Sequence, residues 1–132
     1  MSELRAVNPP GWARPKGYSN GIAAAGRTIA VSGMIGWDAE RRLVAADIAG
    51  QVRQALQNIV DVLALAGGKP EHIVRMNWYF VDKYEYLNAS TQIGEVYREL
   101  MGRHYPAMTA LQVAALLEDG ARIEIEATAV VP

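Results

Sequence analysis

The feature that most constrains the fold is the segment from Asp47 to Ala66, where apolar side chains recur at three- and four-residue spacing. Asp47 precedes the pattern as a suitable N-cap, and Gly67-Gly68 and Pro70 end it. The apolar positions are Ile48, Val52, Leu56, Ile59, Val60 and Leu63. This spacing predicts a long amphipathic helix.

Strands and a second helix are expected in the remaining chain. Residues 73–81 are rich in β-branched and aromatic residues, and residues 122–130 alternate apolar and polar side chains, so both predict strands. Residues 109–116 predict a further strand, and residues 84–103 predict a second helix that Gly94 weakens.

The first third of the chain is less regular. Residues 1–19 are rich in Pro and Gly and predict an irregular arm, with a short strand around residues 4–7. Residues 22–25 and 28–32 flank Gly26-Arg27, which predicts a β-hairpin that ends at Gly33.

These elements predict an α+β fold in one domain spanning residues 1–132, a length that suits a single core. Two helices can cover only one face of the mixed sheet. We expect the strand over residues 73–81 to be buried on both sides, so the other face needs a partner. An oligomer built on that face is the simplest solution.

Composition excludes several classes of function. The chain has no cysteine and a net charge of −1 with no basic run, which argues against thiol chemistry and nucleic-acid binding. No apolar segment at the N-terminus or later is long enough for a signal or a membrane span, so the expected location is cytoplasmic. His72 and His104 have no nearby ligand-type residues, so no metal site is expected.

Short motifs along the chain resemble the YjgF/Rid family, also called endoribonuclease L-PSP. Each is weak alone, but they occur in order over nearly the whole sequence. They are Gly17-Tyr18-Ser19-Asn20, Val31-Ser32-Gly33, residues 51–59, Ala66-Gly67, Ile73-Val74-Arg75, Val81-Asp82, Tyr97-Arg98-Glu99, Tyr105-Pro106-Ala107 and residues 123–127.

The resemblance implies a chorismate-mutase-like fold, assembled as a homotrimer with a barrel-like centre and clefts between subunits. Active members of the family hydrolyse reactive enamines and imines to a carbonyl compound and ammonia. They use no metal or organic cofactor. The implied partners are other copies of the chain and a small-molecule ligand, and neither nucleic acid nor membrane.

The main departure from the family pattern is Met108. Deaminating members carry an arginine there that binds the substrate carboxylate, and a methionine cannot replace its hydrogen bonds. Either the ligand lacks a carboxylate at that point and is more apolar, or another cation reaches the cleft. Arg14 and Lys16 in the arm are the candidates for the second explanation.

Other candidate site residues follow from the family match. Glu124 corresponds to the residue that orients or activates the hydrolytic water, although an outward charge on an alternating strand is the simpler interpretation. Glu126, on the same side of that strand, is expected to be structural or interfacial. The expected cleft walls are Tyr18, Ser32, Gly33, Met108 and Ala110, with Trp12 and Trp37 as possible aromatic walls.

Two functions remain open from the sequence. One is an enamine or imine deaminase with an atypical substrate, in which Glu124 activates water. The other is a non-catalytic trimer that binds a small metabolite in the same cleft, which the loss of the arginine at Met108 favours. RNA cleavage is disfavoured because a basic cluster and a histidine pair are both missing.

Overall fold

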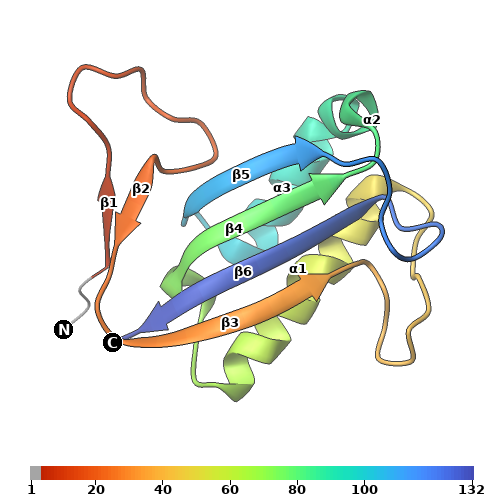
Figure 1. Ribbon diagram of the computed structural model, residues 1–132, viewed down its shortest axis with the longest axis horizontal. Helices are drawn as coiled ribbons and strands as arrows, with labels where there is room; N and C mark the ends of the chain where they lie inside the picture. The colour runs from red at the N-terminus through yellow and green to blue at the C-terminus, as the bar shows by residue number, and fades with distance from the viewer. Residues whose placement is uncertain (1–3) are drawn as a thin grey trace.

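The computed structural model describes residues 4–132, and its centre is a four-stranded mixed sheet (Figure 1). The strand order is β3-β6-β4-β5. Only β4 and β5 run parallel, and the other neighbours are antiparallel. The strands span Arg27–Met34 (β3), Ile73–Phe80 (β4), Ala107–Gln112 (β5) and Ile123–Val131 (β6).

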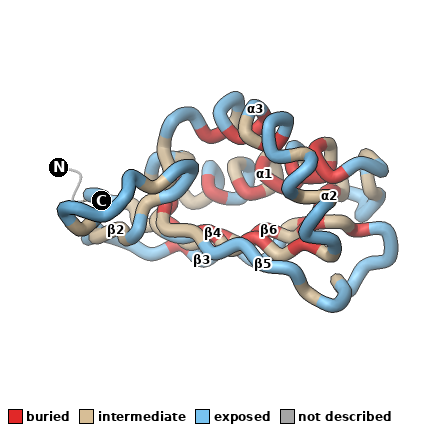
Figure 2. Tube along the Cα trace, turned by 90° about the horizontal axis from the view of Figure 1, so that it is seen from above, coloured by how far each residue is buried: buried red, intermediate tan, exposed pale blue. Residues whose placement is uncertain are grey.

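The helices cover one face of this sheet, and the other face is open (Figure 2). Helix α1 (Ile48–Leu65) packs against β3, β6 and α3 (Ser90–Met101), and the short α2 (Lys83–Asn88) contacts α3. A single turn of 3-10 helix, η1 (Pro70–His72), precedes β4. The core lies between α1, α3 and the sheet, and this confirms the α+β class and the mixed sheet.

Helix α1 forms where the apolar spacing predicts it. The Asp47 side chain accepts a hydrogen bond from the Gly50 backbone N–H at 3.1 Å, which caps the first turn. Val52, Leu56 and Leu63 on its inner side are fully buried. The helix ends at Leu65, and Gly67 follows with a positive φ of 80° that favours glycine.

The predicted second helix is two helices rather than one. The Asp82 carboxylate accepts backbone hydrogen bonds from Tyr84 and Glu85 at 2.9 and 3.2 Å, so α2 starts at Lys83. The chain then turns at Ala89, and α3 begins at Ser90. Ala89 carries no helix-breaking signal, so the break was not visible in the sequence.

The predicted hairpin around Gly26-Arg27 is wrong. The short strands β1 (Arg5–Val7) and β2 (Gly21–Ala23) pair with each other, while β3 pairs with the C-terminal strand β6. Gly26 has a φ of 146°, and a Cβ there would lie 2.7 Å from the carbonyl carbon of Val131. The glycine therefore permits close approach of the chain end rather than a hairpin turn.

Strand β4 is buried on one side only, which corrects the expectation of burial on both. Met76, Trp78 and Phe80 face the helices and are buried, whereas Asn77 and Tyr79 on the open face are half-buried. The last two strands are displaced slightly from their predicted ranges. Strand β5 spans Ala107–Gln112 rather than residues 109–116, and β6 spans Ile123–Val131 rather than residues 122–130. Within residues 4–132, no helix is long and apolar enough to cross a membrane.

Candidate functional site

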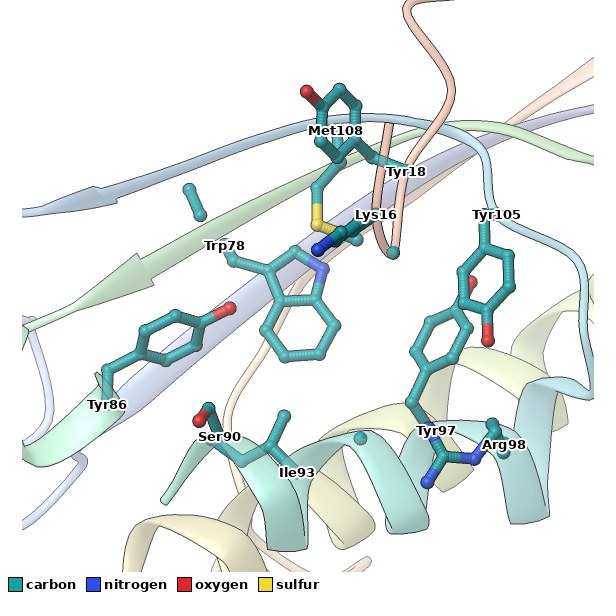
Figure 3. A pocket seen from close by; sticks show the side chains of 13 residues that line it. Lys16, Tyr18, Trp78, Tyr86, Ser90, Ile93, Tyr97, Arg98, Tyr105 and Met108 are labelled. Carbon is teal, nitrogen blue, oxygen red and sulfur yellow. The ribbon is translucent and has the colours of Figure 1, made fainter. Parts of the chain in front are cut away.

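A cavity of about 490 Å³ opens between the β4–β5 edge of the sheet and the helices α2 and α3 (Figure 3). Its size lies in the range typical of small-molecule sites. Aromatic rings from several elements line it: Trp78 from β4, Tyr86 from α2, Tyr97 from α3 and Tyr105 from the segment before β5. The cavity is therefore suited to an apolar or aromatic ligand.

Three of the expected cleft residues line this cavity. Met108 and Ala110 on β5 lie in register with the buried Met76 and Trp78 on β4, so their side chains are on the helix side of the sheet. Tyr18 reaches the cavity from the arm.

Hydrogen bonds fix the arm that carries Tyr18. The Ser19 backbone N–H donates to the Pro106 carbonyl at 3.0 Å, and the Ser19 hydroxyl donates to the Tyr105 carbonyl at 2.6 Å. Both acceptors directly precede β5, so Tyr18 and Met108 are held on the same edge of the sheet.

The other three expected residues, Ser32, Gly33 and Glu124, lie away from this cavity on the open face. A β-bulge explains the placement of the first two: Val31 pairs with Ala127 and Met34 with Ile125, so Ser32 and Gly33 both oppose a single residue of β6. A Cβ on Gly33 would lie 2.9 Å from Cδ of Glu124. Glycine at this position lets the Glu124 carboxylate lie directly over the backbone of β3, and a larger residue would require the carboxylate to move.

The two carboxylates on the open side of β6 differ in their surroundings. Glu126 accepts hydrogen bonds from the Tyr79 hydroxyl at 2.6 Å and the Asn77 amide at 2.9 Å. These bonds, the one from Tyr79 first, hold the pKa of Glu126 below its ordinary value. Among the described residues, Glu124 has no hydrogen-bond or ion-pair partner, so its carboxylate is available to a ligand or water.

The bonds to Glu126 predict a pH-dependent contribution to stability. Because the folded-state pKa of Glu126 is lowered, its stabilisation is present above the ordinary pKa of 4.5 and is lost as the pH falls through the folded-state value. We expect Glu126→Gln to reduce the free energy of unfolding at pH 7 and to have less effect near pH ~3. Urea unfolding at both pH values measures this. Glu118→Gln, which removes an exposed loop carboxylate, is the control, and an equal loss at both pH values would contradict the prediction.

Two cations border the aromatic cavity. Lys16 from the arm lies there, as the sequence suggested, whereas Arg14 lines a neighbouring hollow with Arg5 and Arg103. The second cation is Arg98 on α3, which sequence reasoning did not select. A signal was present: Arg98 follows Gly94 by four residues, so the two lie on the same side of the helix.

The aromatic wall also differs from expectation. Trp12 is exposed in the loop between β1 and β2, and Trp37 lies in the loop after β3, so neither borders the cavity. Trp78 instead supplies the tryptophan ring that lines the cavity. Its position in the strand predicted over residues 73–81 indicated only a role in the core. In residues 4–132, no group of three or more metal-ligating side chains was found.

The comparison with protein families agrees with the geometry. The family model described as endoribonuclease L-PSP matches residues 12–131, which is nearly the whole chain. The chain belongs to the endoribonuclease L-PSP (YjgF/Rid) family. The match covers every strand of the main sheet and all the residues that line the aromatic cavity.

Several mammalian relatives within this family are named as deaminases, and others as RutC family proteins. Human 2-iminobutanoate/2-iminopropanoate deaminase is 36% identical over 128 residues, which cover 96% of this chain and 88% of the human protein. A RutC family protein of Pyrococcus horikoshii is 35% identical, and the match covers 85% of each chain.

Solved structures of the endoribonuclease L-PSP family share the fold. The Rid family protein YyfB from Yersinia pestis has a TM-score of 0.86 at 31% identity and covers 97% of this chain and 98% of its own. RidA from an Antarctic Psychrobacter has a TM-score of 0.69, also at 31% identity, and covers 90% of this chain and 92% of its own.

Proposed function

We propose that this protein hydrolyses a reactive enamine or imine to a carbonyl compound and ammonia, and that its substrate differs from those of its named deaminase relatives. Family membership and the names of those relatives support the reaction class. The observation that carries the proposal is the unpartnered Glu124 carboxylate above Gly33, since a general base must be free to accept a proton.

The reaction needs one proton acceptor and one water molecule. Glu124 takes a proton from water as the oxygen adds to the carbon of the C=N bond, and then gives this proton to the nitrogen. As the C–N bond of the resulting carbinolamine breaks, Glu124 passes the hydroxyl proton to the departing nitrogen, so ammonia leaves, the C–O bond becomes a carbonyl and Glu124 is again a carboxylate. The sum is imine plus water to carbonyl plus ammonia, so no cofactor enters the balance.

The placement of the candidate residues supports catalysis between subunits. Tyr18, Met108 and Ala110 lie at the helix side of the β5 edge, whereas Glu124 and the bulge at Ser32 lie on the open face of the sheet. One small substrate cannot contact both sets within a single chain. A homotrimer whose open sheet faces form a barrel-like centre would bring the Glu124 of one subunit to the aromatic cavity of the next.

Met108 supports the change of substrate. Its thioether borders the cavity where a carboxylate-binding arginine is expected, and sulfur is a weak acceptor that cannot donate to an anion. The surrounding rings favour a larger, apolar substrate over a short imino acid.

A direct test generates imines from different amino acids with an amino-acid oxidase. An added amine traps part of each imine as an adduct, and the measurement is how the imine divides between this adduct and the hydrolysis products. We expect the protein to divert flux from the trapped adduct to free carbonyl compound and ammonia. The diversion should be greater for phenylalanine than for alanine, because the cavity is large and aromatic. A rate equal to that in buffer for all imines would overturn the proposed activity.

That outcome would favour the second candidate, a trimer that binds a small metabolite without catalysis. Met108 is the observation that supports it, since the usual anchor for a substrate carboxylate is missing. Ligand-induced thermal stabilisation without any turnover would distinguish it from the hydrolase.

A further inference from the structure

The aromatic cavity contains a buried donor with no acceptor. Trp78 is 1% exposed, and its Nε1 is the one fully buried side-chain polar atom without a hydrogen-bond partner in residues 4–132. In Figure 3 the indole nitrogen lies on the ring edge turned toward Tyr105 rather than toward Tyr86. Because such groups are rarely left unpaired, this N–H is a candidate donor to a ligand in the cavity that the Trp78 ring lines.

The second element is the guanidinium group of Arg98. It borders the same cavity, and no ion pair or hydrogen bond engages it among the described residues. A Cβ on Gly94 would lie 3.3 Å from its Nη1, so the guanidinium folds back over the helix at this glycine. Glycine within a helix is unfavourable, and here it leaves space for the planar cation beside the cavity.

Arg98 is better suited than Lys16 to bind a carboxylate. A guanidinium group donates two parallel hydrogen bonds to a carboxylate, whereas an ammonium group acts as a point charge. Arg98 also projects from α3, a regular helix, while Lys16 belongs to the irregular arm. A site on a helix holds its geometry more accurately than one on a loop.

We propose that Arg98 replaces the arginine missing at Met108 as the carboxylate anchor, and that the ligand is an imine or 2-oxo acid with an aromatic side chain. The Trp78 N–H donates to its imine nitrogen or carbonyl oxygen, and its ring packs among the tyrosines. This inference rests on the proposed function for the imine, but the binding of a stable 2-oxo acid tests it independently of catalysis.

The test measures binding of two probes by calorimetry: phenylpyruvate, and phenylacetone as its analogue without a carboxylate. We expect Arg98→Gln to weaken phenylpyruvate binding about 10- to 100-fold and to leave phenylacetone binding unchanged. Arg98→Lys should recover part of the affinity. Trp78→Phe should weaken both probes, because both carry the carbonyl acceptor.

Arg103→Gln is the matched control, since it removes an equal charge just beyond α3 from a residue that does not border this cavity. Equal phenylpyruvate affinity of wild type and Arg98→Gln, or equal losses in Arg98→Gln and Arg103→Gln, would overturn the inference. So would a wild-type protein that binds neither probe. Binding that depends on Arg98 without imine hydrolysis would overturn only the proposed function.

Discussion

Replacing Glu124 with glutamine is expected to slow imine hydrolysis about 100- to 10,000-fold, the range that a general base contributes. The amide keeps the shape of the side chain but cannot take a proton from water. Glu124 has no hydrogen-bond partner among the described residues, so the free energy of unfolding should change by less than about 0.5 kcal/mol. Steady-state rates and urea unfolding of the same preparation measure both effects.

Glu126→Gln is the matched control on the same strand and the same face. Its carboxylate is already engaged by Tyr79 and Asn77, so we expect this change to affect stability more than rate. An equal loss of activity in both variants would show that the charge of the open face matters, rather than a base at Glu124. Full activity of Glu124→Gln would remove this residue from the mechanism.

A mixing experiment tests whether the site is shared between subunits. Met108→Trp fills the aromatic cavity, and Glu124→Gln removes the base, so each protein alone should be inactive. In the proposed homotrimer, assembly from equal amounts of both chains would leave about a quarter of the clefts with both halves intact. No recovery of activity in the mixed trimers would contradict a cleft built from two chains.

The sequence predicted the elements whose signals are local. The spacing in α1 and the alternation in β6 belong to single segments, and both elements end within two residues of the predicted positions. Pairing of distant segments was harder to predict. The segment around Gly26 was predicted to form a hairpin turn, but Gly26 lies against Val131, a contact that no local pattern indicates.

The same contrast between local motifs and distant pairing applies to the candidate site. The family motifs identified Tyr18, Met108 and Glu124, but their separation onto two faces depends on strand order and on the bulge at Ser32-Gly33. Arg98 was missed because a charged residue on a helix is usually solvated. Only its position over Gly94 and at the border of the aromatic cavity distinguishes it.

Gln51→Leu is expected to lower the free energy of unfolding by about 3 kcal/mol, because it removes three hydrogen bonds to backbone groups, each contributing about 1 kcal/mol. Gln51 is fully buried in α1. Its amide donates to the carbonyls of Ala45 and Gly120 at 3.0 Å each, and its carbonyl accepts from the Arg122 N–H at 2.7 Å. Leucine has a similar volume but offers neither donor nor acceptor.

Losing the hydrogen bond between Gln51 and the Arg122 N–H should also alter the position of Glu124. Arg122 directly precedes β6 and lies two residues before Glu124. We therefore expect Gln51→Leu to reduce hydrolysis even under conditions where the protein remains folded. Gln57→Leu on the same helix is the control, because the Gln57 amide bonds only the exposed side of the helix, to Asp61 at 2.8 Å. It should change stability by less than about 0.5 kcal/mol. Equal effects of the two substitutions in urea unfolding would show that the bonds from Gln51 to Ala45, Gly120 and Arg122 do not stabilise the fold.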